Sequence, residues 1–188
     1  MVVRQIVTYP NEILRKKTPV IMKVDDELLK DIESLKEVLL SEKQHAAGLA
    51  APQIGISKRF FGGLMERGKN KVRIYINPKI GKTFGEKVKP MMVFEDGKEE
   101  PFWEGCLSFP DLFGQVKRYL KIEASWKEII NGKLETKNEK LEGILAIVFQ
   151  HESEHLEGIL FVDHLKEEGG EMIKMVGGKE IKWEVGKI

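Results

Sequence analysis

The chain has 188 residues, of which 41% are hydrophobic, so it can bury a core and is not expected to be disordered. Its 31 basic and 30 acidic residues leave a formal charge of +1, which argues against direct nucleic-acid binding. One cysteine excludes an internal disulfide, and the longest apolar runs fall short of the roughly 20 residues that cross a bilayer. The first residues lack the apolar stretch of a secretion signal. We therefore expect a cytoplasmic protein with no membrane association, folded as a single domain over residues 1–188.

Two helices and one strand are predicted in the N-terminal half. A proline at the first turn marks the first helix, and apolar residues at helical spacing after an aspartate cap mark the second. The strand is expected to stop at an Asn-Pro pair. A stretch rich in Lys, Glu and Gly follows it and reads as an exposed excursion. The two helices are predicted at residues 10–15 and 26–41, the strand at 73–77 and the excursion at 81–101.

The C-terminal half begins with an expected β-hairpin. Apolar and polar residues alternate before Asn131-Gly132, a strong two-residue hairpin signal, and a second strand follows. The next segment is apolar on every side and reads as a buried helix that ends near Gly158. Antiparallel strands mixed with helices, without repeated βαβ units, predict the α+β class. The predicted elements are hairpin strands at 122–130 and 133–140, the buried helix at 144–157, strands at 161–162 and 181–185, and a short helix at 172–176.

The second half of the buried helix carries two histidines and a glutamate in an HExxH pattern. His151 and His155 are four residues apart, which is about 40° of rotation on a helix, so both rings leave one face and can clamp one metal ion. Glu152 lies about 100° away from His151. It can therefore reach a metal-bound water as a general base more easily than it can join the metal ligands. The alternative is a hydrogen-bonded polar turn inside the core.

A metal site needs a third ligand, and Cys106 is the leading candidate. It follows Gly105 in an irregular stretch, and a thiolate with two imidazoles makes an open tetrahedral site with one place for water. The alternative for a lone cysteine is a small core residue. The longer metzincin pattern is excluded, because Phe161 stands where its third histidine is required. A zinc endopeptidase that uses Glu171 or Glu180 as the third ligand stays open as an alternative.

Three separated segments resemble the marker sequences of the peptide deformylases, which remove the N-formyl group from newly made bacterial and organellar proteins. The family pattern GxGLAAxQ is similar to residues 46–53, EGCLS to 104–108 and QHExxH to 150–155. The resemblance implies a single catalytic domain, with its motif-bearing core in about residues 1–165 and a C-terminal extension in 166–188. It also implies antiparallel sheets packed around a central buried helix that carries HExxH.

The resemblance further implies a role for each chemical group. Glu152 activates the metal-bound water for attack on the formyl carbon and later passes a proton to the leaving amine. Gln53 and the backbone N–H of Leu107 donate hydrogen bonds to the formyl oxygen as it gains negative charge. The metal is one divalent ion, expected to be Fe²⁺, which Zn²⁺, Ni²⁺ or Co²⁺ can replace. Its implied ligands are Cys106, His151 and His155.

The peptide substrate is implied to lie along the chain like an added strand, because Gly48 has no side chain to obstruct it. Residues that precede His151 on the helix line an apolar pocket for the methionine side chain, although plain core packing explains Leu145 equally well. Glu104 is expected to pair with Arg118, the alternative being two solvated charges. The expected substrate-binding residues are Ala47, Gly48, Glu104, Gly105, Leu145, Val148 and Phe149.

The implied partners are N-formylmethionyl nascent peptides, which the protein is expected to bind near the ribosome. The protein is expected to be a monomer. Several features depart from the family pattern. Ala46 replaces a glycine, a glycine pair at 62–63 falls where a continuous strand is expected, and the stretch 81–103 is long enough to form a flap near the substrate. His45 and His164 lie outside the motifs and are expected at the surface. An inactive relative that binds nascent chains or a structural metal is a further alternative.

Overall fold

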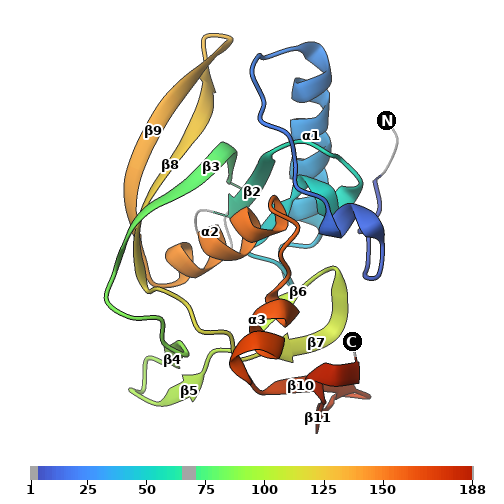
Figure 1. The fold of residues 1–188 in the computed structure, drawn as a ribbon, viewed down its shortest axis with the longest axis vertical. Helices are drawn as coiled ribbons and strands as arrows, with labels where there is room; N and C mark the ends of the chain where they lie inside the picture. Colours follow the sequence, from blue (N-terminus) through green and yellow to red (C-terminus); the bar gives the residue numbers. More distant parts are fainter. Residues whose placement is uncertain (1–3, 65–70, 188) are drawn as a thin grey trace.

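The computed structural model describes residues 4–64 and 71–187 and arranges them in three antiparallel sheets with three α-helices (Figure 1). The largest sheet has the strand order β1-β2-β3-β8-β9, the second has the order β11-β10-β7-β6, and β4 pairs with β5. Every strand pair is antiparallel, which confirms the predicted α+β class. The helices are α1 (Asp26–Ser41), α2 (Ile144–His155) and α3 (Phe161–Glu168), and 3₁₀ turns lie at Glu12–Arg15, Ala51–Ile54 and Val185–Lys187.

The strands differ widely in length. Those of the largest sheet are β1 (Gly48–Ala50), β2 (Phe60–Leu64), β3 (Val72–Phe84), β8 (Lys121–Ile130) and β9 (Lys133–Glu142). Those of the second sheet are β6 (Glu104–Cys106), β7 (Phe109–Gly114), β10 (Met172–Val176) and β11 (Lys179–Lys182). The small hairpin consists of β4 (Met91–Val93) and β5 (Glu99–Pro101).

The largest sheet separates α1 from α2, because successive residues of a strand face opposite sides of the sheet. Phe60 of β2 packs into the cluster that contains the apolar residues of α1, whereas Phe61 packs into the cluster that contains those of α2. The glycine pair does not interrupt β2. Gly62 faces α1, where a Cβ would lie only 2.6 Å from the Cδ2 atom of Leu35. Glycine at this position therefore lets α1 approach the sheet closely.

The local signals in the sequence predicted α1 and the long hairpin correctly. The Asp25 carboxylate caps α1 by accepting a hydrogen bond of 2.9 Å from the Leu28 amide. Asn131 and Gly132 form the turn between β8 and β9 with φ of 49° and 75°, the positive values that a tight two-residue turn requires. The helix predicted at 10–15 is the 3₁₀ turn Glu12–Arg15. The buried helix predicted at 144–157 is α2, which ends at His155.

The strand predicted at 73–77 does not stop at the Asn-Pro pair, and this prediction is wrong. β3 continues to Phe84, with a register shift against β8 between Ile76 and Lys79. Asn77 has φ of 51°, and its side chain accepts from the Ile21 amide at 2.9 Å and donates to the Ile21 carbonyl at 2.7 Å. The pair thus forms a bulge, which bends a strand without ending it and needs no ladder hydrogen bond from proline.

The predictions for the C-terminal region are also corrected by the structure. Residues 161–162, expected as a strand, begin α3, whose first turn is capped by Asp163 accepting from the Leu160 amide at 2.8 Å. Residues 172–176, expected as a helix, form β10, which pairs with β7 and β11. The strand expected at 181–185 ends at Lys182 as β11. The tight Gly177-Gly178 turn and the pairing with β7 favour strand over helix here.

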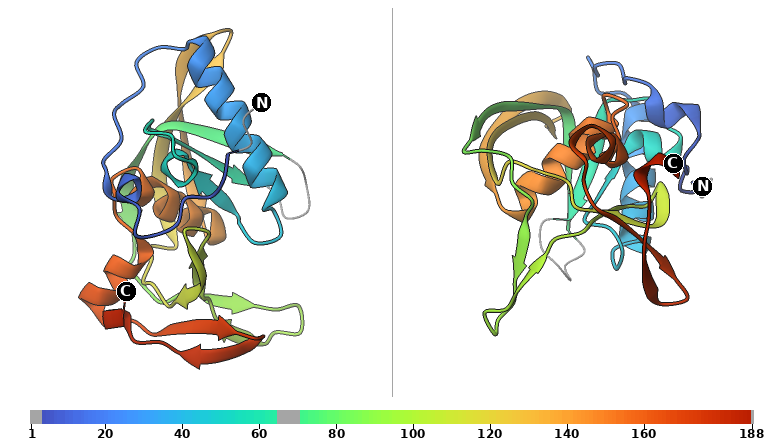
Figure 2. Two further views of the ribbon diagram at one scale, coloured as in Figure 1. Left: turned by 90° about the vertical axis from the view of Figure 1, so that its right-hand side faces the viewer. Right: turned by 60° about the horizontal axis from the view of Figure 1, so that its bottom comes forward.

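Most of the excursion predicted at residues 81–101 forms a projecting hairpin of β4 and β5. β4 and β5 extend away from the body of the protein, and both views of Figure 2 show them projecting in the same general direction as the separate β10–β11 hairpin. All three residues of β4 are exposed. Within residues 4–64 and 71–187, no helix is long and apolar enough to cross a membrane.

Candidate metal centre

Helix α2 brings two histidines together at its C-terminal end. Its apolar first half packs against the largest sheet through residues such as Phe149, which fixes the helix in place. The rings of His151 and His155 have centroids 4.9 Å apart, and their Nε2 atoms are 3.2 Å apart. Both side chains are buried. Two imidazoles out of water at such a short distance need a shared partner, and a cation is one that suits both nitrogens.

Cys106 reaches the same point from the end of β6. Its Sγ atom is 3.3 Å from His155 Nε2, and the sulfur and one nitrogen of each histidine all lie within 4.8 Å of one another. Ligand atoms around one tetrahedral ion, at bond lengths of about 2.0–2.3 Å, lie about 3.3–3.6 Å apart. The three donors therefore fit one divalent cation. Neither Glu171 nor Glu180 belongs to this group.

Glu104 fixes the orientation of the first histidine. Its Oε1 atom lies 2.7 Å from His151 Nδ1, which leaves Nε2 of that ring directed to the group of donors. Arg118 donates two hydrogen bonds to the same carboxylate, at 2.9 and 2.6 Å. Burial alone would raise the pKa of the Glu104 carboxyl, but the charges of Arg118 and His151 outweigh it and hold that pKa well below its usual range. The predicted pair of Glu104 and Arg118 is present and buried.

Glu152 occupies an apolar setting beside the histidines. Burial raises the pKa of its carboxyl to about 7, an effect that the nearby His151 only partly offsets. Its Oε2 atom is buried, and it has no hydrogen-bond partner among the residues that the structure describes. Such a carboxylate is suited to exchange a proton near neutral pH. The backbone of Gly48 lies against it, since a Cβ on Gly48 would be 2.6 Å from Glu152 Oε1.

Gln53 points its amide group at the same centre. The side chain is held by its own Oε1 atom, which accepts from the Ala50 amide at 2.8 Å. Its Nε2 atom then lies 3.4 Å from the sulfur of Cys106 and 3.3 Å from Ser108 Oγ. Leu107 directly follows Cys106, so its backbone N–H is adjacent to the thiol along the chain. The structure thus gathers an acidic group, three candidate metal-ligand atoms and an amide donor within one small region.

Comparisons with known proteins agree with this geometry. The sequence profile of the polypeptide deformylase family matches residues 3–170. The chain belongs to this family. It is 38% identical to the peptide deformylase of Thermotoga sp. (strain RQ2) over 157 residues, which is 84% of each chain. It is 37% identical to the peptide deformylase of Desulfotalea psychrophila over 168 residues, 88% of this chain and 89% of that one.

Solved structures of polypeptide deformylases show the same fold. The crystal structure of the Thermotoga maritima peptide deformylase has a TM-score of 0.71 with 34% identity, and the match covers 87% of this chain and 98% of that one. A peptide deformylase structure from Legionella pneumophila has a TM-score of 0.72 with 30% identity, covering 87% and 86%. The chain is therefore a member of a hydrolase family whose fold it shares.

The residues expected to bind substrate differ in burial and lie on different elements. Ala47 and Gly105 are exposed, and Gly48 lies at the free edge of the largest sheet. Leu145 and Val148 are half-buried on α2. Phe149 is 2% exposed and packs against Phe61 and Tyr75, with ring centroids 5.4 Å away in both cases. The core role of Phe149 is thus visible, and the pocket role of these residues stays a prediction.

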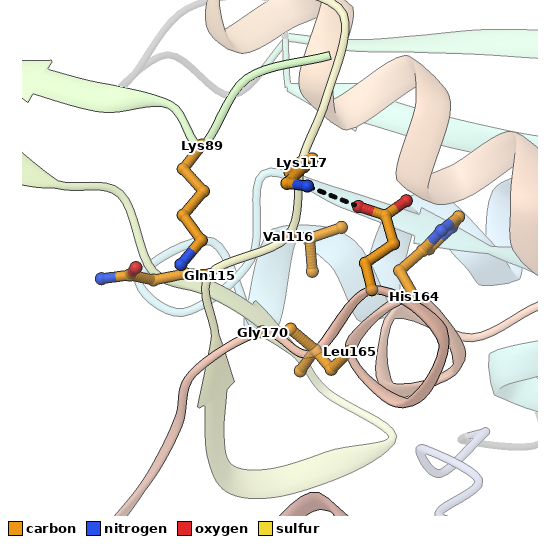
Figure 3. Close-up of a pocket in the computed structure, with 8 residues that line it drawn as sticks. Lys89, Gln115, Val116, Lys117, His164, Leu165 and Gly170 are labelled. Atoms are coloured by element: carbon orange, nitrogen blue, oxygen red, sulfur yellow. Dashed lines mark ion pairs between the residues drawn. The ribbon is translucent and has the colours of Figure 1, made fainter.

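One part of this candidate centre was not predicted from the sequence. Glu154 accepts two hydrogen bonds of 2.7 Å from Arg118, although its neighbour along the helix is a metal-ligand candidate. His164, expected at the surface, has a side chain only 13% exposed and lies 3.0 Å from Glu154. His164 lines a pocket of about 10 Å³, where Figure 3 shows its ring beside the carboxylate that pairs with Lys117. His45 is exposed as predicted. The signal in the sequence that could have indicated this contact is Arg118. A buried arginine that pairs with one carboxylate through some of its N–H groups needs a further acceptor for the others.

Proposed function

We propose that this chain removes the formyl group from N-formylmethionyl peptides and releases formate, with one divalent cation held by Cys106, His151 and His155. The convergence of one sulfur and two imidazole nitrogens within 4.8 Å beside a buried carboxylate is the observation that carries the proposal. A cation bound there supplies Lewis acidity, which lowers the pKa of water and polarises the formyl carbonyl. Ferrous iron is the expected ion, and a thiolate with two imidazoles also suits zinc, nickel or cobalt.

The proton transfers are assigned to Glu152. Its carboxylate takes a proton from the attacking water and later gives it to the amine that leaves as the amide bond breaks. A pKa of about 7 supports both steps, because the group can accept and release a proton near neutrality. Gln53 Nε2 and the Leu107 amide donate to the formyl oxygen as negative charge grows on it, and each such donor is worth on the order of 10²–10³ in rate.

The peptide is proposed to bind as an added strand. β1 and β6 are both edge strands, so the backbone of Gly48 and that of Glu104 and Gly105 can pair with an extended peptide. Ala47 precedes β1 at the same edge. The methionine side chain enters an apolar pocket lined by residues of α2. The proposed pocket residues are Leu145, Val148 and Phe149, which lie two to six residues before His151.

The cellular setting is proposed from the family. The chain acts as one catalytic domain over residues 1–188, as a monomer in the cytoplasm, on nascent peptides near the ribosome. A balanced charge of +1 supports the absence of direct nucleic-acid binding.

Anaerobic measurement of formate release tests the proposed activity. The Fe²⁺-loaded protein is given formyl-Met-Ala-Ser, and acetyl-Met-Ala-Ser serves as the matched control substrate. Rapid release of formate with no cleavage of the acetyl peptide is expected. Equal rates on both peptides, or cleavage between residues, would instead indicate a general amidase or an endopeptidase.

Two variants separate the roles of the site residues. Glu152→Ala is expected to lose turnover while it keeps its metal, because the carboxylate moves protons and is not a ligand. Cys106→Ala is expected to lose most bound metal, since two imidazoles alone bind weakly. Metal content is measured after gel filtration. Wild-type metal content in Cys106→Ala would favour the endopeptidase ligand set.

A further inference from the structure

Glu154 sits next to His155 in the sequence but turns away from the metal-ligand atoms. Its two carboxylate oxygens each lie 2.7 Å from the Nη1 atom of Arg118. Arg118 uses its other nitrogens, Nε and Nη2, to donate to Glu104 at 2.9 and 2.6 Å. Glu104 in turn lies 2.7 Å from Nδ1 of His151. Glu154, Arg118, Glu104 and His151 therefore form one continuous hydrogen-bonded network, which ends at a ring of the candidate centre.

The middle of this hydrogen-bonded network is well shielded from water. The side chains of Arg118 and Glu104 are 2% and 5% exposed, and that of Glu154 is 19% exposed. Charges at such short distances in a poorly solvated region affect one another strongly. Two carboxylates share one guanidinium here, so the negative charge of Glu154 offsets part of the positive potential that Arg118 places on Glu104.

The charge of Glu154 therefore bears on the bond between Glu104 and His151. With Glu154 ionised, its negative charge offsets part of the potential of Arg118 at Glu104, and Glu104 accepts strongly from the imidazole. Without that negative charge, the positive potential of Arg118 at Glu104 is no longer offset, and Glu104 becomes a weaker acceptor for His151. A weaker outer bond makes a histidine less basic and less well oriented toward a metal.

We propose that Glu154 is a positioning residue for His151, acting through Arg118 and Glu104 on the strength with which the centre holds its cation. This inference rests on the proposed function, since it requires that the cation be bound there. At the outer end of the network lies His164, whose Nε2 atom is 3.0 Å from Glu154 without hydrogen-bond alignment. His164 also lines the pocket between α3 and residues 115–117 (Figure 3).

The competing explanation is a purely structural ion pair. In that case Glu154 holds α2 against the segment that carries Arg118, and its loss lowers folding stability without changing His151. The two explanations differ in their effect on metal binding. A positioning role changes the affinity for a cation and the geometry of the bound cation, whereas a structural role changes only the unfolding temperature.

Cobalt binding by the full-length protein is the test. The affinity for Co²⁺ is measured by competition with a chelator, and the visible absorption of bound Co²⁺ reports the arrangement of its ligands. Glu154→Gln, Glu104→Gln and the double variant are compared. Substituting an outer partner of a metal ligand typically weakens affinity 10–100-fold. We expect about a tenfold loss in Glu154→Gln, a larger loss in Glu104→Gln, and an altered absorption band in both.

The double variant decides whether the two glutamates act in series. If Glu154 works through Glu104, the double variant binds Co²⁺ no more weakly than Glu104→Gln alone. Additive losses would show independent effects and overturn the proposal. Glu157→Gln is the matched control, because Glu157 is also an ion-paired carboxylate near the end of α2 but pairs with Lys17 and Arg59. It should leave Co²⁺ affinity unchanged.

Two further variants guard against a folding defect. Glu154→Asp keeps the charge and should retain most of the Co²⁺ affinity. Arg118→Lys cannot bridge two carboxylates, so it should lose affinity as Glu154→Gln does. Unchanged Co²⁺ affinity in both Glu154→Gln and Arg118→Lys would overturn this inference alone. A wild-type protein that binds no Co²⁺ would overturn the proposed function as well.

Discussion

Replacing Gly48 by alanine tests how closely β1 holds the side chain of Glu152. The added Cβ would lie 2.6 Å from Glu152 Oε1 and 2.7 Å from its Cγ, whereas ordinary contact begins at 3.4 Å. The carboxylate must therefore retreat by about 0.8 Å, the difference between 3.4 and 2.6 Å. A displacement of about 1 Å from the productive position costs on the order of 10²-fold in rate. We expect kcat for deformylation to fall about 10²-fold in Gly48→Ala.

The assay is steady-state formate release from formyl-Met-Ala-Ser by the Co²⁺-loaded protein, with bound metal measured in parallel. Metal content is expected to stay close to wild type, because the methyl group meets Glu152 and not a candidate metal ligand. The control is Gly63→Ala, which changes the residue paired with Gly48 across the β1–β2 ladder and brings a Cβ only to 3.2 Å from Tyr75. A kcat within twofold of wild type in Gly48→Ala would refute the reasoning. A rise in KM with unchanged kcat would show that the methyl group obstructs the peptide without displacing Glu152.

Three other predictions follow from the structure. Gln53→Leu should lower kcat by about 10²–10³ with little change in KM, since its amide acts on the transition state; a change confined to KM in the same steady-state assay would contradict this. Gly62→Ala should lower the free energy of unfolding by about 1–3 kcal/mol in urea titrations, because the added methyl would overlap Leu35, and unchanged stability would refute that packing. Burial raises the pKa of Asp163, but its hydrogen bonds from Arg15 and the α3 backbone outweigh this and leave the pKa lowered. The carboxylate therefore stabilises the fold above the ordinary aspartate pKa of about 3.9, and this contribution is lost as the pH falls through the lower folded-state value. Asp163→Asn should have a lower Tm than wild type at pH 7, with the difference shrinking below about pH 4; a constant difference would contradict it.

Features set by neighbouring residues were predictable from the sequence. The turn at Asn131-Gly132 requires a backbone conformation that those two residues readily adopt, and it sets the register of the two strands beside it. The spacing of His151 and His155 depends only on helix geometry, so their common face follows directly. The identity of Cys106 as the third member of the group came from the family resemblance and from its being the one thiol, and the structure brings its sulfur to the histidines.

Features set by distant partners were not predictable in the same way. Residues 172–176 lack a strong strand pattern and form β10 because β7, far earlier in the chain, offers a free edge. β3 continues past Asn77 because the side chain of Asn77 makes two hydrogen bonds to the Ile21 backbone, and no local sequence signal indicates this contact. The pairing of Glu154 with Arg118 likewise depends on how α2 meets a separate loop.

The C-terminal hairpin shares a sheet with the strand that ends in Cys106. β10 and β11 extend this sheet beyond β7, which is the neighbour of β6 (Figure 2). A protein shortened to residue 170, where the family profile stops, would keep every side chain assigned to chemistry. It would nevertheless remove the strand that pairs with β7, together with Met172, which belongs to the core cluster against which Cys106 packs. Residues beyond the end of the family profile thus help to hold the sheet that carries Cys106.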